Sequence, residues 1–410
     1  MSAMAAITPF NPDAPELKAN PYPIFAQLRE QDPIHRAAFG YWVVSRYEDV
    51  RATLMDRTGF GQGNFVENIR LFYGPDFDVL GHTSYRWLSE VFLMQDPPQH
   101  TRVRGLVTGA LTAKRVRAME PRIREISHML IDQIEAQGAV DMIKAYCYKL
   151  PVLVMCDMLG IDPHDARLPE IMNAIAQSFI IFEARALSKE ELAIADREIA
   201  KLEDFFSKLF AERKAHPQDD LTTALVQSGD GADALSHHEL VTVAIGLFGA
   251  GFETTAHMIG NGLLCLNRFP EQWAKLCADP QGLAANVVNE TLRYESSLIA
   301  TYRTALEPRT IHGQAIKAGE KVLTLIGAAN HDPRQFENPD RFNIERDATT
   351  HMSFGGGIHF CAGAELARLE GRIAFETLAT RLPNLRVEKD QPQWRDGFLF
   401  RGLSQLPAHC

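Results

Sequence analysis

Residues 354–363 read F-G-G-G-I-H-F-C-A-G, and the rest of the chain can be interpreted outward from this stretch. Cys361 follows three consecutive glycines and precedes a segment with the composition of a helix. A thiol at the start of a helix lies near unpaired N–H groups and a partial positive charge, which favour the thiolate. Because glycine has no Cβ, the preceding turn lets the backbone approach something large and flat. A thiolate held against a large planar partner indicates a ligand of haem iron.

The same stretch is also compatible with three roles that involve no haem. A lone cysteine is most often a small buried hydrophobic residue. A glycine-rich turn before a helix can also bind phosphate, but a phosphate loop ends in Lys and Ser or Thr, whereas this helix opens with Cys and Ala. A nucleophilic cysteine is the third alternative, and it needs a base that the sequence does not place.

The stretch fills every fixed position of F-G-x-G-x-[HR]-x-C-x-G, and in this it resembles the haem-binding signature of the cytochrome P450 family. The resemblance extends over nearly all of the 410 residues. It implies a mainly α fold with minor β (α+β), in which a long central helix lies over the haem and small sheets lie at the periphery. No Ser/Gly/Pro tract, charge block or repeat divides the chain, so we expect residues 1–410 to form a single domain.

Composition and charge restrict the class of protein. A net charge of −10 argues against a nucleic-acid-binding protein, which needs a basic face. The six cysteines are scattered with no C-x-x-C pair, which argues against iron–sulfur and zinc sites and fits a reducing cytoplasm. The N-terminus lacks a basic segment followed by an apolar core, and polar residues interrupt the longest apolar run, near 240–268. We therefore expect a cytoplasmic protein with no membrane segment. We also expect a monomer.

A long helix is expected to begin at Ser236, because Ser236 and Glu239 have the spacing of a capping box. Within it, residues 250–255 read A-G-F-E-T-T, and the neighbouring glycines each cost a helix about 1 kcal/mol. A packing site, with a threonine bonded back to the preceding turn, would account for this composition. The functional interpretation is an opened helix at which Thr254 offers a hydroxyl and Glu253 connects protons to solvent. The segment resembles the oxygen-activation motif of the family, [AG]-G-x-[DE]-T, so Glu253 and Thr254 are the predicted catalytic residues.

The segment N-E-T-L-R places Glu290 and Arg293 three apart on a helix. Such a pair is usually a surface ion pair worth a few tenths of a kcal/mol. Here it resembles the E-x-x-R of the family, which implies a structural network with an arginine from the following coil. Arg341, in N-P-D-R-F, is the predicted third member.

The resemblance also implies a cofactor, haem b. Its two propionates need cationic or hydrogen-bonding partners. The predicted cofactor-binding residues are His100, Arg104, Arg303, Phe354, His359 and Cys361, and Cys361 is the predicted metal ligand.

Substrate contacts are predicted by position and would form an apolar pocket. A Phe or Leu at helical spacing is as compatible with a core as with a pocket. The predicted substrate-binding residues are Phe179, Phe182, Leu247, Phe248, Ala250, Leu298, Ile299 and Phe398.

These features predict a haem-thiolate monooxygenase that inserts one oxygen atom from O2 into a small apolar organic substrate. The sequence has no flavin or iron–sulfur motif, so electrons are expected from a ferredoxin and an NAD(P)H-dependent ferredoxin reductase. A basic patch of Arg104, Lys114, Arg115 and Arg368 is the expected docking site. One alternative is a peroxide-driven peroxygenase or an isomerase on the same fold, against which the Glu-Thr pair argues. The others are a haem-dependent ligand-binding protein without turnover and a haem-free cysteine enzyme.

Overall fold

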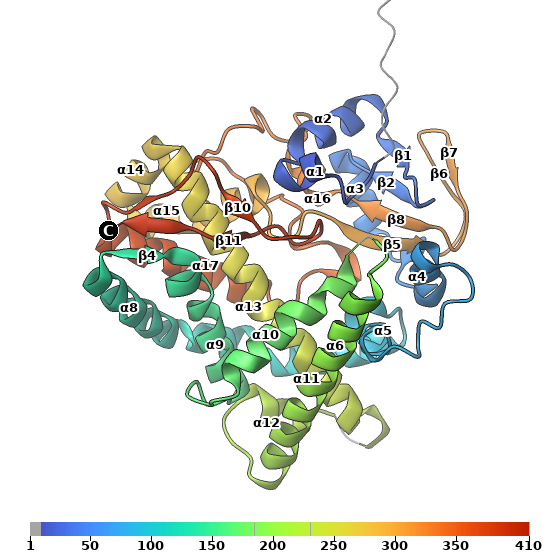
Figure 1. Cartoon of the computed structure of the whole chain (residues 1–410), viewed down its shortest axis with the longest axis horizontal. Helices are drawn as coiled ribbons and strands as arrows, with labels where there is room; N and C mark the ends of the chain where they lie inside the picture. The colour runs from blue at the N-terminus through green and yellow to red at the C-terminus, as the bar shows by residue number, and fades with distance from the viewer. Residues whose placement is uncertain (1–9, 184, 230, 410) are drawn as a thin grey trace, which may run out of the picture.

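The computed structural model describes residues 10–183, 185–229 and 231–409. Helices make up most of the body, and small sheets lie at its edges (Figure 1). The predicted fold class, mainly α with minor β, is confirmed.

The longer helices are α2 (Tyr22–Gln31), α3 (Tyr47–Met55), α4 (Phe65–Tyr73), α5 (Thr83–Glu90), α6 (Gln99–Ala110), α8 (Glu120–Gln137), α9 (Lys149–Leu159), α10 (Leu168–Ser178), α11 (Lys189–Ala215), α13 (His237–Arg268), α14 (Pro270–Ala278), α15 (Pro280–Tyr294) and α17 (Ala364–Arg381). The shorter ones are α1 (Pro15–Ala19), α7 (Ala113–Ala118), α12 (Leu221–Val226) and α16 (Ile326–Asn330), with the helical turns η1 (Phe92–Met94), η2 (Ile143–Cys147), η3 (Phe179–Phe182), η4 (Gly231–Asp233) and η5 (Gly357–His359).

Helix α13 runs through the middle of the molecule (Figure 1). The predicted capping box is confirmed: the Ser236 hydroxyl accepts the N–H of Glu239, and the Glu239 carboxylate accepts the N–H of Ser236. With 32 residues the helix is about 48 Å long, and most of its side chains are buried against α9, α11, α15 and α17. Because α13 is buried on nearly all sides, its side chains are accessible only where the surrounding helices do not cover it.

The strands form four small sheets. They are β1 (Ile34–Arg36), β2 (Trp42–Val44), β3 (Phe60–Gly61), β4 (Ala139–Asp141), β5 (Thr301–Ala305), β6 (Arg309–Ile311), β7 (Gln314–Ile316), β8 (Lys321–Thr324), β9 (Arg386–Val387), β10 (Gln393–Trp394), β11 (Leu403–Gln405) and β12 (Pro407–His409). The largest sheet has the order β1-β2-β8-β5-β3, in which only β2 and β8 are parallel. It lies at one edge of the body beside α1 to α4 (Figure 1).

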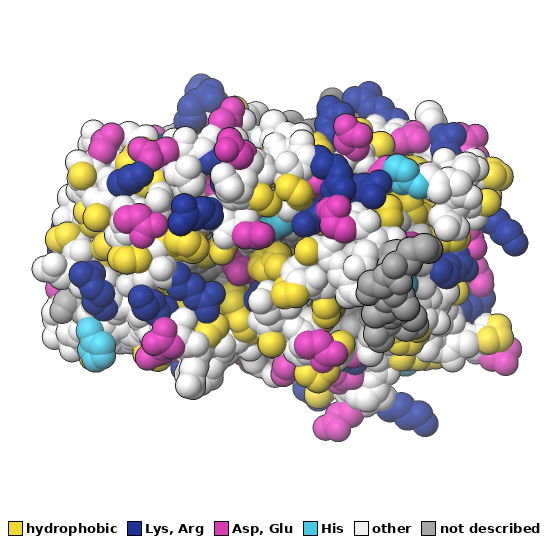
Figure 2. All heavy atoms as spheres, turned by 90° about the horizontal axis from the view of Figure 1, so that it is seen from above, with side chains coloured by type: hydrophobic (Ala, Val, Ile, Leu, Met, Phe, Trp, Pro, Cys, Tyr) yellow, Lys and Arg dark blue, Asp and Glu magenta, His cyan; other side chains and the backbone are white. Residues whose placement is uncertain are grey.

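Three buried clusters carry the fold. The largest surrounds α13, a smaller one joins α2, the largest sheet and the segment near Phe398, and a third joins the largest sheet to α3. The surface seen in Figure 2 carries both signs of charge interspersed with hydrophobic side chains. Within the described ranges, no helix combines the length and apolarity that crossing a bilayer requires.

Candidate active site

The loop before α17 holds Cys361 in a fixed turn. The N–H of Cys361 donates to the carbonyl of Phe354 at 2.9 Å. Gly355 and Gly357 have φ of +70° and +63°, a region that side chains rarely adopt. A Cβ on Gly357 would lie 2.5 Å from the Leu54 carbonyl oxygen, at the end of α3. Glycine at position 357 therefore allows close packing of the loop on α3, a role that the sequence did not suggest.

The Cys361 side chain is exposed, and α17 begins three residues after it, at Ala364. The protein around the thiol limits its hydration, and this desolvation raises the pKa of Cys361. The N–H of Gly363 and the charges of Arg104 and Arg368 act in the opposite direction but do not outweigh it. The backbone N–H at the helix start thus lowers the pKa of Cys361 as expected, but desolvation outweighs it. A metal ion bound to the sulfur would supply the missing positive charge.

Four cationic or potentially cationic side chains meet near Cys361. The imidazole centroids of His100 and His359 lie 4.4 Å apart, and both ring nitrogens of each are buried without a hydrogen-bond partner among the described residues. Arg303 is buried and donates only to the carbonyl of Tyr302, at 2.7 Å. The Arg104 guanidinium donates to the carbonyl of Phe360.

The charges of this cluster influence one another. Burial and the nearby Arg303, His100 and Arg104 lower the pKa of His359 to about 3. Burial lowers the pKa of Arg303 to about 10. In the part of the chain that the structure describes, no carboxylate lies within ion-pair distance of any of the four. The cluster has the donor chemistry that a pair of carboxylates requires.

Helix α13 presents one accessible strip on its otherwise buried surface. Leu247, Ala250, Gly251 and Thr254 are partly or fully exposed, and their spacing places them on one side of the helix. The Thr254 hydroxyl donates to the carbonyl of Ala250 at 2.7 Å, so the back-bonding that accounts for a mid-helix threonine is present.

The glycines flanking Ala250 serve packing. A Cβ on Gly249 would lie 2.3 Å from Cζ of Phe179, and one on Gly251 would lie 2.5 Å from Sδ of Met155. Packing therefore accounts for these glycines, while the exposed strip leaves the functional interpretation of Thr254 intact.

Glu253 faces a different set of neighbours from Thr254. Its carboxylate is buried, and Oε1 accepts a hydrogen bond of 2.5 Å from Nη1 of Arg395, while Oε2 has no partner in the described chain. Arg395 also donates to the Tyr148 hydroxyl, which lies 3.2 Å from Nε2 of His257. Burial raises the pKa of Glu253, and Arg395 partly offsets this. Arg395 lies far from Glu253 in the sequence and belongs to no motif, so no sequence pattern predicted this contact.

The E-x-x-R pair is fully buried. Arg293 donates to Glu290 through two bonds of 2.8 Å and also reaches the carbonyls of Asn330, Pro339 and Arg341. Arg341 contributes only this carbonyl, because its side chain is exposed.

The arginine side chain that approaches Glu290 is that of Arg346, with Nε 3.4 Å from Oε1. The prediction for the third side chain was therefore displaced by five positions along the coil. The coil turns between the two arginines, and this turn directs Arg346 inward.

The predicted substrate contacts divide into two groups. Leu247 and Ala250 lie on the accessible strip of α13, and Phe179 and Phe182 lie beside it with ring centroids 5.2 Å apart. Leu298 is partly exposed and pairs with Phe400 across an isolated bridge.

Three predicted contacts face the core instead. Phe248 packs on Phe206, at 5.9 Å between centroids, on another side of α13 from Leu247. Ile299 and Phe398 are buried in the smaller cluster, where Phe398 contacts Phe10 at 5.5 Å.

The sequence missed Phe400, whose ring lies 5.8 Å from that of Phe182 and 6.4 Å from that of Phe179. The alternation of a strand would have linked it to Phe398, but the chain bends between the two residues.

Residues 66–281 and 282–401 match the family model described as Cytochrome P450. The chain is 35% identical over 414 residues to Polyketide biosynthesis cytochrome P450 PksS of Bacillus subtilis (strain 168), over 97% of this chain and 98% of that protein. The chain belongs to the cytochrome P450 family. It is also 35% identical over 394 residues to 6-deoxyerythronolide B hydroxylase of Saccharopolyspora erythraea, over 94% of this chain and 95% of that protein. Among solved structures it is similar to P450BioI in complex with hexadec-9Z-enoic acid ligated acyl carrier protein, with a TM-score of 0.87, 33% identity and coverage of 96% and 99%.

This cytochrome P450 is accordingly a monooxygenase, an oxidoreductase that works with haem iron. The residues present fit that cofactor. The cluster of His100, Arg104, Arg303 and His359 lacks the carboxylates that its donors require, and the exposed thiol of Cys361 is available as a ligand. Phe354 lies beside them, with the Arg368 guanidinium 4.4 Å from its ring centroid.

Proposed function

We propose that this cytochrome P450 holds haem b through Cys361 and inserts one oxygen atom from O2 into an apolar organic substrate. The observation that carries the proposal is a cluster of four donor side chains that no carboxylate of the described chain pairs, beside an exposed cysteine. His100, Arg104, Arg303 and His359 would bind the propionates, and Cys361 Sγ would bind the iron. Bound haem supplies the oxidising chemistry.

The protein's own residues would control protons and orientation. Glu253 would hold and release a proton at Oε2, the oxygen that Arg395 leaves free, and its raised pKa suits that task. Thr254 would offer its hydroxyl on the accessible strip of α13. The N–H of Gly363, with Arg104 and Arg368, would stabilise the charge on the sulfur.

An apolar substrate is supported by the side chains beside this strip. Phe179, Phe182 and Phe400 form a contiguous aromatic surface next to Leu247 and Ala250. Similarity to a polyketide biosynthesis cytochrome P450 and to 6-deoxyerythronolide B hydroxylase also supports an organic substrate.

The experiment that tests the function is the ferrous–CO spectrum of the purified protein. Wild type should show the absorption typical of thiolate-ligated haem, and Cys361→Ser should lose it. A wild-type protein without a Soret band, or a variant that retains the thiolate spectrum, would refute the assignment.

We further propose that the enzyme is a cytoplasmic single-domain monomer that takes electrons from a ferredoxin and its NAD(P)H-dependent reductase. The basic side chains of Arg104, Lys114, Arg115 and Arg368 support docking near Cys361, although Arg115 already lies 3.8 Å from Asp219. Reversing the charge of Lys114 and Arg368 together should slow electron transfer and weaken its dependence on salt. Unchanged rates at low and high salt would remove this patch from the proposal.

A further inference from the structure

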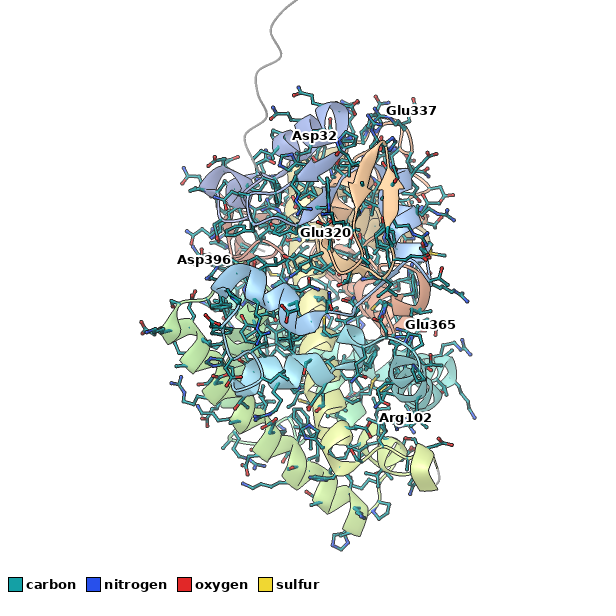
Figure 3. All side chains as sticks on the ribbon, turned by 90° about the vertical axis from the view of Figure 1, so that its right-hand side faces the viewer. Asp32, Arg102, Glu320, Glu337, Glu365 and Asp396 are labelled. Carbon is teal, nitrogen blue, oxygen red and sulfur yellow. The ribbon has the colours of Figure 1, made fainter. Side chains whose placement is uncertain are left out.

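Lys321, at the start of β8, is a buried lysine. It is 7% exposed, and its ammonium has no hydrogen bond and no counter-ion among the described residues. The nitrogen lies 3.7 Å from the ring centroid of Tyr302 and 4.8 Å from that of Phe72. The preceding residue, Glu320 (labelled in Figure 3), is not its partner, because its carboxylate accepts a bond of 2.7 Å from the indole of Trp42. A buried charge without a partner is costly, so its retention calls for a physical reason.

Two further polar atoms beside Lys321 lack partners. The hydroxyls of Tyr41 and Tyr302 are buried and make no hydrogen bond within the described chain. The rings of Tyr41 and Tyr302 are 6.3 Å apart, and Phe72 lies 6.3 Å from Tyr41, so these side chains form one cluster with the lysine. Contact between an ammonium and aromatic faces would account for the lysine alone, but not for two unpaired hydroxyls. Together these three side chains offer donor groups to a partner that only accepts, which is the chemistry of an anion.

This cluster is separate from the proposed propionate site. Strands β5 and β8 are antiparallel, with Thr304 opposite Lys321 and Arg303 opposite Val322. Side chains alternate along a strand, so Arg303 and Lys321 point to opposite faces of the sheet. A ligand at Lys321 is therefore not a propionate held by Arg303.

An apolar surface leads from α13 toward Lys321. It starts at Phe179, which packs on Gly249, and passes through Phe182 to Phe400. Phe182 and Phe400, with Leu298, are partly buried against the same cluster that Phe72 and Tyr302 contact. Helix α4, which carries Phe72, lies alongside β5 (Figure 1), and the side chain of Asn68 donates to Thr304 at 2.8 Å. An extended apolar molecule with one anionic end matches this arrangement.

We propose that Lys321, Tyr41 and Tyr302 bind the carboxylate of an amphiphilic substrate whose apolar chain runs toward α13. The inference rests on the proposed function, which it deepens by naming the substrate class: long-chain carboxylic acids. Burial lowers the pKa of Lys321 to about 7, and a bound carboxylate would raise it by supplying the missing opposite charge.

The test compares dodecanoate with methyl dodecanoate by calorimetry on the full-length ferric protein at about pH 6, where the lysine is protonated. We expect wild type to bind the acid about tenfold more tightly than the ester, since only the acid makes a charge-assisted bond. Lys321→Met should abolish this preference, so that the variant binds the acid no more tightly than the ester. Lys317→Met is the matched control, because Lys317 is exposed in the turn that precedes β8 and its replacement should keep the preference.

If Lys321→Met does not fold, Tyr41→Phe and Tyr302→Phe replace it, and each should weaken binding of the acid more than of the ester. Equal binding of acid and ester by wild type, or a preference that survives the loss of Lys321, would overturn the proposal.

A second readout does not involve haem chemistry. Reductive methylation with ¹³C-formaldehyde gives the lysines NMR signals, and the Lys321 signal should titrate at a higher pH when dodecanoate is present. Inorganic phosphate at the same concentration should have no such effect, and an equal effect would contradict a site built for a carboxylate substrate. Because this titration reads Lys321 directly, its failure is distinguishable from failure of the ferrous–CO test.

Discussion

Replacing Arg346 should cost more stability than replacing Arg341, although both arginines lie in the same coil. The guanidinium of Arg346 donates to the carbonyls of Glu337 and Asn338 and approaches the buried Glu290 at 3.4 Å. The side chain of Arg341 is exposed, and only its backbone carbonyl takes part in the network. Methionine retains much of the length of arginine and removes the donors.

The expected difference follows from these contacts. Two hydrogen bonds to carbonyls are worth about 0.5–1.5 kcal/mol each, and the long contact to a charged carboxylate adds a similar amount. Arg346→Met should therefore cost about 2–4 kcal/mol, and Arg341→Met no more than about 0.5 kcal/mol. The entropy of unfolding is about 2.1 cal/mol/K per residue, so 1 kcal/mol corresponds to about 1.2 °C in a chain of 410 residues. The Tm should therefore fall by about 2–5 °C in Arg346→Met and by less than about 1 °C in Arg341→Met.

Scanning calorimetry measures these Tm values on variants that carry the same fraction of bound haem. Glu290→Gln gives the upper reference, since it leaves Arg293 buried without its charge partner, which costs about 3–5 kcal/mol. If Arg341→Met lowered Tm as much as Arg346→Met, the assignment of the third side chain to Arg346 would be refuted.

Two more predictions concern protons. Thr254→Ala should keep substrate binding but lower the product formed per NADH and raise peroxide release. Arg395→Met should also lower the product formed per NADH, because it removes the hydrogen-bond partner of Glu253 and raises the pKa of that carboxyl group further. Normal coupling in both variants would remove Thr254 and Glu253 from proton delivery. Burial lowers the pKa of Lys321 to about 7 from an ordinary value of 10.5, so between these values the unfolded chain binds a proton that the folded chain does not. The free energy of unfolding should therefore rise with pH from about 7 to about 10.5, and this rise should be smaller in Lys321→Met. Thermal melts across this pH range measure the rise. The same dependence of Tm on pH in wild type and variant would contradict the burial of an uncharged amine.

The features that the sequence predicted well are those with a local pattern. The capping box at Ser236 needs only two residues three apart, and the helix that it starts was found with its correct beginning. The turn before Cys361 was recognised from ten consecutive residues, and the family resemblance then placed His100 and Arg303 beside one another although they are distant in the chain. Such placement came from resemblance and not from the pattern of the residues.

The features that the sequence did not predict depend on which side of a helix a residue faces or on where the chain bends. Leu247 and Phe248 are neighbours, but about 100° of helix rotation separates an exposed strip from a core contact. A bend between Phe398 and Phe400 sends one ring into the core and leaves the other beside Phe182. Arg395 reaches Glu253 from a hairpin at the other end of the chain, and no local pattern encodes that contact.

The largest sheet has a consequence for how the molecule forms. Its β2 strand, near the N-terminus, pairs in parallel with β8, and the N–H of Tyr47 binds the carboxylate of Asp332. During synthesis β2 leaves the ribosome long before β8 exists, and closing so long a loop is slow. The N-terminal segment must therefore wait, exposed to proteases and chaperones, until about four-fifths of the chain has been made. Both Arg303 and Lys321 would reach their places only at this late stage.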